Sequence, residues 1–151
     1  MKIRIELVDD ITEDEVLIRC GRVDETVKKI HQYIVAQSSL SNKITFYKKN
    51  REFYFPLDDV LFFETEGEHI YAHTKNDEYR IKHRLYELED MLPGHFVRAS
   101  KSAIVNIGKV YSITRNITAS SLITFIDSHK HIYVSRHYYK ELRNRMSERK
   151  V

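Results

Sequence analysis

The sequence predicts a mainly β protein, α+β overall, whose short strands follow a small N-terminal segment. The chain holds 10 Tyr and 7 Phe among 151 residues but only 4 Gly and 2 Pro, and aromatic residues favour strands. After Asn42, brief apolar runs recur between polar turns, which is the spacing of short strands. A chain of this length is expected to form one domain with at most a short appendage.

Residues 1–42 are predicted to form an N-terminal strand-strand-helix extension. Residues 2–8 and 15–20 each have the apolar pattern of a strand, and Asp24 can cap a helix from Glu25 to about Ala36. The small polar residues 37–42 are predicted to be a linker. The single cysteine, Cys20, lies in an apolar stretch, so it is expected to be a core residue in a reducing compartment.

Residues 43–151 are predicted to hold the other strands. The continuous apolar run 60–63 indicates a strand buried on both faces. His69, Tyr71 and His73 are expected to share one face of the next strand, because side chains alternate along a strand. The remaining strands are expected at 44–47, 53–55, 79–82, 96–97, 104–106, 110–113, 122–125 and 132–134.

Two helices are expected among these strands. Leucines at 85, 88 and 92 recur at helical spacing, and Pro93-Gly94 ends that helix. Ser135 is a favourable N-cap for a last helix. Its basic stripe consists of Arg136, Lys140 and Arg143.

Charge is unevenly distributed along the chain. The net charge is only +3, but residues 1–26 are rich in Asp and Glu. Residues 129–151 carry an excess of basic residues: Lys130, Arg136, Lys140, Arg143, Arg145, Arg149 and Lys150. An acidic head and a basic tail indicate that the second half meets a polyanion, although an ordinary solvated surface has the same composition.

The sequence lacks the patterns of common enzymes and metal sites. It contains no Gly-x-Ser-x-Gly, no Gly-rich phosphate loop and no His-Glu-x-x-His. His69 and His73 would lie about 13 Å apart along a strand, too far to bind one ion. His129 and His131 have no carboxylate or cysteine at ligand spacing. For both pairs, surface histidines are the simpler interpretation. We expect neither catalysis nor a metal or other cofactor.

Membrane insertion and secretion are not expected. No apolar run approaches the roughly 20 residues that span a bilayer. Residues 1–6 alternate charged and apolar side chains, unlike a signal peptide. The chain is therefore expected to be cytoplasmic.

Two segments set basic and hydroxyl side chains between apolar anchors, and both suit a nucleic acid. Residues 96–106 contain Arg98, Ser100, Lys101 and Ser102. Residues 134–140 open a helix with Ser135, Arg136, His137 and Lys140. Such groups bind phosphates or the acceptor edge of guanine, and a helix N-terminus favours a phosphate. Each segment alone is more typical of an ordinary polar loop or cap.

Together, three motifs resemble the LytTR family of bacterial DNA-binding domains. The resemblance runs from near Ile44 to about Met146. The first motif is Val60-Leu61-Phe62-Phe63-Glu64-Thr65-Glu66-Gly67. The second and most specific is Leu85-x-x-Leu88-Glu89-x-x-Leu92-Pro93-x-x-Phe96-x-Arg98-x-x-Lys101-Ser102-x-x-Val105-Asn106. The third is Val134-Ser135-Arg136-x-Tyr138.

The resemblance implies a stack of β-sheets whose loops, rather than a recognition helix, enter successive major grooves. It implies base contacts from near Glu68 and His69, from Lys101, and from Arg136 or His137. Family members often have His at the position of Ser100 and Arg at that of Lys101. Because Lys lacks the planar fork of Arg, two-pronged recognition of guanine is less expected here.

The expected function is therefore a sequence-specific DNA-binding transcription regulator, bacterial and standalone, without a receiver domain. By the same resemblance, it would bind repeats in promoter double-stranded DNA as a homodimer. By analogy, a small membrane protein would inhibit it. Two alternatives stay open: a protein-interaction module controlled by a membrane-bound partner, and an enzyme of unfamiliar type.

Overall fold

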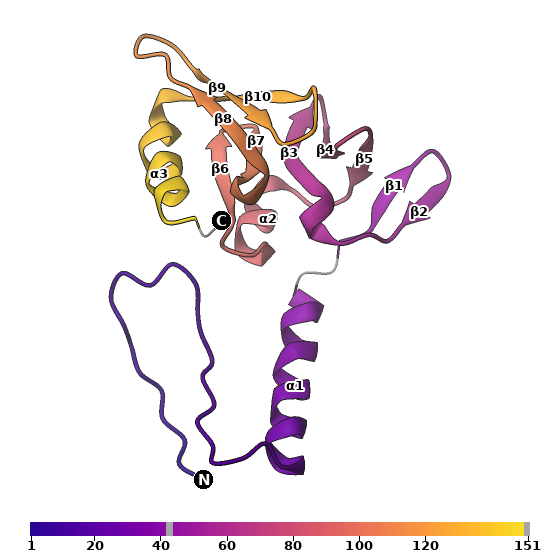
Figure 1. Ribbon diagram of the computed structural model, residues 1–151. Helices are drawn as coiled ribbons and strands as arrows, with labels where there is room; N and C mark the ends of the chain where they lie inside the picture. Colours follow the sequence, from indigo (N-terminus) through magenta and orange to yellow (C-terminus); the bar gives the residue numbers. More distant parts are fainter. Residues whose placement is uncertain (42–43, 150–151) are drawn as a thin grey trace.

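Strands dominate the computed structural model, which describes residues 1–41 and 44–149. Within these residues, one sheet has the strand order β2-β1-β5-β4-β3-β7-β6, and a second sheet has the order β10-β9-β8. Neighbouring strands are antiparallel throughout. The predicted mainly β class, α+β overall, is confirmed (Figure 1).

The strands follow the predicted apolar runs closely. They are β1 (Phe46–Lys48), β2 (Arg51–Phe53), β3 (Val60–Glu66), β4 (His69–Thr74), β5 (Glu78–Ile81), β6 (Phe96–Ser100), β7 (Ala103–Asn106), β8 (Val110–Thr114), β9 (Ser121–Phe125) and β10 (His131–Val134). Strand β2 is shifted toward the N-terminus: it ends at Phe53, where the strand expected at 53–55 would begin. There the ring of Phe55 instead stacks on Phe46, with centroids 4.0 Å apart.

Strand β3 is an interior strand of the larger sheet, between β4 and β7. Its first four residues are buried, as the continuous apolar run predicts. The hairpin to β4 turns at Gly67, whose φ is +61°. Glycine adopts this backbone conformation without steric cost, which suits a two-residue hairpin turn.

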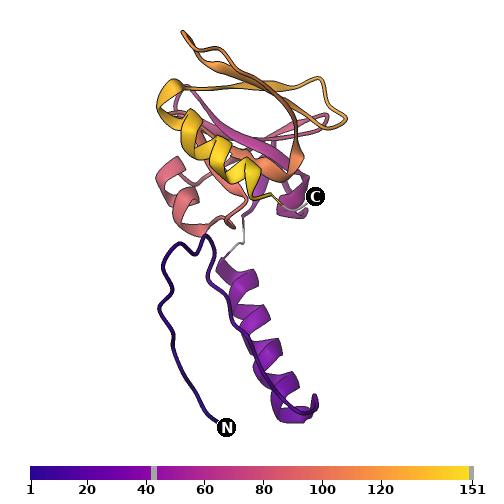
Figure 2. The same cartoon turned by 60° about the vertical axis from the view of Figure 1, so that its left-hand side comes forward.

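Two apolar layers cover the two faces of the larger sheet. On one face, Phe62 and Val105 pack with residues of the smaller sheet and with Leu142 of α3 (Arg136–Ser147). On the other face, Phe63 packs with Leu88 of α2 (Leu85–Met91). Figure 2 shows this order of layers, with the smaller sheet above and α2 below. Each fully buried large side chain stabilises the fold by roughly 1.5–3 kcal/mol.

One residue of the most specific motif has a structural role. Asn106 is buried, and its amide donates to the carbonyl oxygen of Val60 at 3.0 Å. Its side-chain oxygen accepts from the backbone N–H of Gly108, also at 3.0 Å. Asn106 therefore joins β7 to the start of β3 and shapes the turn into β8.

The N-terminal extension differs from its prediction. Residues 1–24 contain no strand, so the strands expected at 2–8 and 15–20 are not formed. A strand needs a neighbour for its backbone groups, and in the described parts of the chain no strand pairs with these segments. Cys20 is exposed, and its predicted place in a core is wrong for the same reason.

The extension does contain its predicted helix. In α1 (Glu25–Ser41), the backbone N–H of Val27 donates to the Asp24 carboxylate at 3.0 Å, so the expected cap is confirmed. The helix continues to Ser41, so residues 37–41 are not a linker, and Asn42 lies outside the described residues. Both views show α1 leading away from the sheets, whereas the N-terminal segment folds back toward them (Figures 1 and 2). Its residues Thr12 and Glu13 line one hollow with Gly94 and Arg145. Among the described helices, none has the length and apolar character to cross a membrane.

Candidate nucleic-acid interface

Two backbone hydrogen bonds bring distant polar segments to one end of the sheets. The N–H of Ser135, just before α3, donates to the carbonyl oxygen of Ala99 in β6 at 2.9 Å. The N–H of Thr65, near the end of β3, donates to the carbonyl oxygen of Ser102 at 2.8 Å. The β6–β7 turn therefore lies between the β3–β4 hairpin and the start of α3.

Arg98 holds the β6–β7 turn in shape. Its Nε donates to the carbonyl oxygen of Ser100 and its Nη2 to that of Lys101, both at 2.6 Å. Its Nη1 pairs with the carboxylate of Glu89 in α2. All three nitrogens of the guanidinium are engaged within the protein. Arg98 therefore holds the backbone of the turn in position.

The turn itself presents Lys101 at its tip. The hydroxyl groups of Ser100 and Ser102 lie 3.3 Å apart, and the N–H of Ser102 donates to the Ser100 hydroxyl at 3.2 Å. Both Lys101 and Ser102 are exposed. A rigid turn with an exposed ammonium at its tip is suited to enter a groove or contact a phosphate.

The start of α3 is a second basic projection. Ser135 has the extended backbone of an N-cap, but its hydroxyl makes no cap hydrogen bond and is buried without a partner among the described residues. Arg136 and His137 follow it, both exposed, and Lys140 is exposed one turn later. The guanidinium of Arg115, in the β8–β9 connection, lies 5.2 Å from the ring centroid of Tyr139 on the same helix.

A third group surrounds His69 and lines a hollow of about 870 Å³ that also reaches Lys101. The other basic residues of this lining are Arg80, Lys82, His83, Arg84 and Arg98. Sequence analysis missed the basic run 80–84 as part of a site. Its signal is the alternation of basic and apolar residues in and after β5, but only the pairing of β5 with β4 places it beside His69.

The basic tail divides into two groups in the structure. Arg136, Lys140 and Arg143 are exposed, as a DNA-binding surface requires. Three others make internal contacts. Arg145 donates to the carbonyl oxygen of Gly94, and Arg149 donates to those of Ile107 at 2.8 Å and Val110 at 2.9 Å. Lys130 lies between the sheets, and Lys150 falls outside the described residues. The number of basic residues in the tail is therefore larger than the number whose charge is available to a polyanion.

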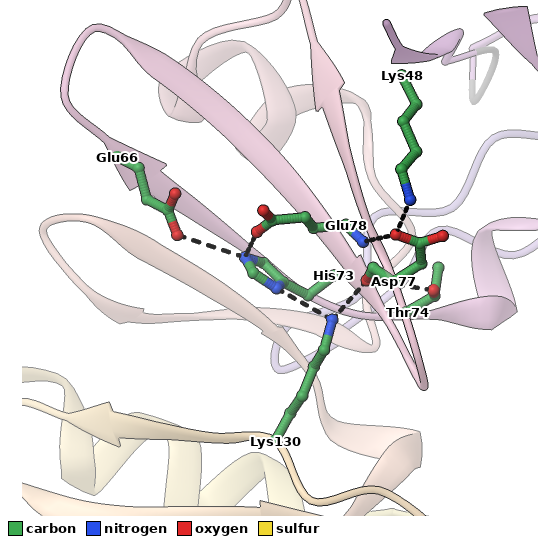
Figure 3. Close-up of polar contacts among 7 residues, drawn as sticks. All are labelled: Lys48, Glu66, His73, Thr74, Asp77, Glu78 and Lys130. Carbon is green, nitrogen blue, oxygen red and sulfur yellow. Dashed lines mark hydrogen bonds and ion pairs between the residues drawn. The ribbon is translucent and has the colours of Figure 1, made fainter. Parts of the chain in front are cut away.

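Lys130 forms part of a polar cluster between the sheets (Figure 3). Its ammonium lies 3.2 Å from Nδ1 of His73 and also donates to the carbonyl oxygen of Asp77, whose carboxylate pairs with Lys48. His73 is buried and its ring stacks on Phe62, so it is not the surface histidine that the sequence suggested. These contacts anchor the loop before β10 to the end of β4.

Burial, followed by the charge of Lys130, lowers the pKa of His73 to about 4. The ring is therefore neutral at pH 7. Its Nε2 lies 3.8 Å from a carboxylate oxygen of Glu66 and 3.7 Å from one of Glu78. Those proximities are not ion pairs at neutral pH, because the low pKa leaves the ring uncharged.

Among the described residues, Glu64, Glu66 and His73 hold possible metal-ligand atoms within 4.8 Å of one another. Burial, then the charge of Glu66, raises the pKa of Glu64. The ligand types suit zinc, but the ammonium of Lys130 donates to Nδ1 of His73. In the neutral ring, Nε2 then carries the proton and offers no lone pair to a cation. The geometry fits a polar contact between sheets better than a metal centre.

Stacked antiparallel sheets with basic turns at one end are the features of a β-type nucleic-acid-binding domain. The chain matches the model of the LytTr DNA-binding domain over residues 50–147 and belongs to that family, which confirms the resemblance. Two relatives in Staphylococcus aureus, strains NCTC 8325 / PS 47 and COL, are named uncharacterized HTH-type transcriptional regulators. Each is 32% identical over 149 residues, covering 97% of this chain and 99% of the relative.

A solved structure has the same fold. It is the LytTr DNA-binding domain of a methyl-accepting/DNA response regulator from Bacillus cereus. The TM-score is 0.62 at 22% identity, and the match covers 67% of this chain and 94% of that one.

Proposed function

We propose that this protein is a sequence-specific DNA-binding transcription regulator whose turns insert into successive major grooves of promoter DNA. The observation that carries the proposal is the pair of hydrogen bonds that hold the β6–β7 turn beside the start of α3 and the end of β3. The family is described by DNA binding and not by a reaction, and the relatives are named as regulators. Such a protein acts where the chromosome is, in the cytoplasm.

The proposal gives each surface residue a role. Lys101, Arg136 and His137 read base edges, because their side chains are exposed on the rigid turn and at the start of α3. Ser102 and Lys140 contact phosphates, which position the protein without reading sequence. Ser135, whose hydroxyl is buried, supports this surface through its backbone hydrogen bond to Ala99. The basic residues around His69 follow the DNA backbone beside them.

The proposal also divides the chain into two parts. Residues 43–151 bind DNA, and residues 1–42 form an extension outside the domain. Two copies bind paired promoter repeats as a homodimer, one domain on each repeat.

Selection of bound duplexes from a random pool, with the full-length protein, tests the proposal. A shared motif should emerge, and anisotropy titrations should show tighter binding to it than to scrambled DNA. Affinity should fall steeply with salt, since each neutralised phosphate adds about −0.9 to the log–log slope. Arg136→Ala should cost roughly 1–3 kcal/mol if it reads a base. Equal affinity for selected and scrambled duplexes would refute sequence-specific recognition.

A further inference from the structure

The N-terminal extension leaves an unusual amount of apolar surface uncovered. Ile3, Ile5 and Leu7 are 89%, 90% and 96% exposed. They alternate with Lys2, Arg4 and Glu6, the pattern of a strand with one apolar face. Other large apolar residues exposed in residues 1–35 are Met1, Val8, Ile11, Val16, Leu17, Val23, Tyr33 and Val35.

This surface is large enough for a stable interface. Soluble monomers rarely expose contiguous apolar patches beyond a few hundred Å². A standard interface buries about 800 Å² on each partner. One large apolar side chain covers roughly 60–120 Å², so about 7 to 13 of them supply that area. The exposed apolar residues of the extension reach that number.

The extension is shared with the relatives but lies outside the DNA-binding unit. The Staphylococcus relatives align over 97% of this chain, so their chains include a matching segment. The family match begins only at residue 50, and the solved domain covers 67% of the chain. The extension is therefore shared with these relatives and lies outside the residues that define the family.

We propose that residues 2–8 pair, antiparallel, with the same residues of a second copy, forming the core of a homodimer. This pairing rests on the proposed function in one respect, because it locates the surface on which the second copy of the proposed homodimer docks. Pairing centred on Ile5 places Ile3 opposite Leu7 on one apolar face. It also places Arg4 opposite Glu6 twice, once on each side of the two-fold axis, and opposite charges across strands stabilise pairing. An interface of this kind is isologous, as two-fold dimers require.

Helix α1 completes the interface. Tyr33, at 67% exposure, and Val35 leave apolar area on the helix, beside the half-buried Val27 and Ile30. Two copies bring two helices to cover the apolar face of the paired strands. Acidic and basic residues nearly balance in residues 1–41, whereas the remainder is basic, so the extension is the part of the chain that tolerates close approach of a second copy.

Pairing with residues 15–20 of the same chain predicts a different charge effect. The register that aligns their apolar residues, Leu7 with Val16 and Ile5 with Ile18, sets Arg4 opposite Arg19. In that arrangement Arg4→Glu removes a repulsion and stabilises the intrachain pairing. In the dimer the same substitution creates two repulsions with Glu6 and destabilises the pairing of the two copies.

Sedimentation equilibrium on the full-length protein tests the dimer. Arg4→Glu and Glu6→Arg should each weaken dimerisation about tenfold or more, because two attractive pairs become repulsive. The double swap Arg4→Glu/Glu6→Arg should restore wild-type affinity. Lys2→Glu is the matched control: it makes the same charge change opposite Val8 and should alter dimerisation little.

Some outcomes overturn the proposal. They are a wild-type protein that stays monomeric at tens of micromolar, additive losses in the double swap, or tighter dimers for Arg4→Glu. A monomer recovered with a membrane fraction would assign the extension to a membrane partner and also overturn it. Binding to a duplex with one half-site separates this proposal from DNA recognition. Dimer variants should retain that binding, whereas a failure of DNA recognition would abolish it in a protein that still dimerises.

Discussion

The backbone N–H of Ser135 donates a 2.9 Å hydrogen bond to the carbonyl oxygen of Ala99. This bond fixes the start of α3 against the end of β6, where the chain turns at Lys101. The two most basic projections of the protein therefore share one rigid support. Their relative position is set by backbone, not by flexible side chains, and this makes it testable by changes at Ser135.

Ser135→Pro should weaken DNA binding and stability together. The φ of Ser135 is −67°, close to the angle that proline imposes, so the backbone conformation itself is compatible with proline. The ring carbon on the nitrogen replaces the hydrogen that points at the carbonyl oxygen of Ala99, so the hydrogen bond is lost and the start of α3 is pushed away from β6. The free energy of unfolding should fall by more than the roughly 1 kcal/mol of one hydrogen bond. DNA affinity should fall further, because Arg136 loses its fixed position. Urea unfolding and anisotropy titrations measure the two effects.

Ser135→Ala should leave stability within about 0.5 kcal/mol of wild type, unlike the ~1 kcal/mol loss at an ordinary N-cap. The reason is that the Ser135 hydroxyl makes no cap hydrogen bond, while the backbone N–H is retained. A loss above about 1 kcal/mol in urea would show that the hydroxyl caps α3 in solution. DNA affinity should stay close to wild type, because the hydroxyl is buried and the backbone bond to Ala99 is retained.

Lys101→Ala should weaken specific DNA binding at unchanged melting temperature, because the ammonium is exposed at the tip of its turn. Lys75→Ala is the matched control, since Lys75 is also exposed but lies beyond the opposite end of β4 from His69. Differential scanning fluorimetry and anisotropy would compare the pair. Equal DNA affinities for the two variants would exclude Lys101 from recognition.

Arg98→Ala should behave differently from Lys101→Ala and destabilise the fold. It removes donors to the carbonyl oxygens of Ser100 and Lys101 and the pairing with Glu89. The expected loss is about 1–3 kcal/mol, with weaker DNA binding as a consequence of a looser turn. If unfolding in urea is unchanged while DNA affinity falls, Arg98 contacts DNA directly.

Acidification should destabilise the protein through His73. Above about pH 6.5 the ring is neutral in both folded and unfolded chains and contributes no pH dependence. Between pH 6.5 and the folded pKa of about 4, the unfolded chain takes up a proton that the folded protein does not. The free energy of unfolding should therefore fall with falling pH, by about 3 kcal/mol at most.

His73→Gln separates this effect from that of other titrating groups. The variant keeps a polar side chain near Lys130, Glu66 and Glu78 but cannot titrate. Urea unfolding at a series of pH values should show a shallower decline for the variant than for wild type. Parallel declines would mean that His73 is protonated with an ordinary pKa.

The salt dependence of DNA affinity should distinguish the exposed basic residues of the tail from those that make internal contacts. Lys140→Ala should reduce the magnitude of the log–log salt slope by about 0.9, because this exposed ammonium neutralises one phosphate in the proposed complex. Arg149→Ala should leave that slope unchanged and lower the melting temperature, because its Nη1 donates to the carbonyl oxygens of Ile107 and Val110. A reduced slope for Arg149→Ala would place it on the DNA surface.

Local sequence pattern was sufficient to predict the elements of residues 44–149, because apolar periodicity and turn residues act over a few neighbouring positions. The run Val60–Phe63 predicts its own buried strand, and Ser135 marks the start of a helix whatever surrounds it. The family motifs extended this to a fold and a candidate surface. What local pattern could not predict was whether a segment would find a partner, which is why the predicted strands at 2–8 and 15–20 are absent.

Packing between distant parts of the chain determines which basic residues face outward. Local sequence does not distinguish the exposed basic residues Lys101 and Arg136 from three others that are held inside the protein. Those three are Arg98, Lys130 and Arg149, and each donates to backbone carbonyl oxygens. Carbonyl groups at strand ends and turns compete for guanidinium and ammonium donors wherever packing brings them within reach. That competition depends on contacts between residues distant in the chain, so composition alone cannot predict its outcome.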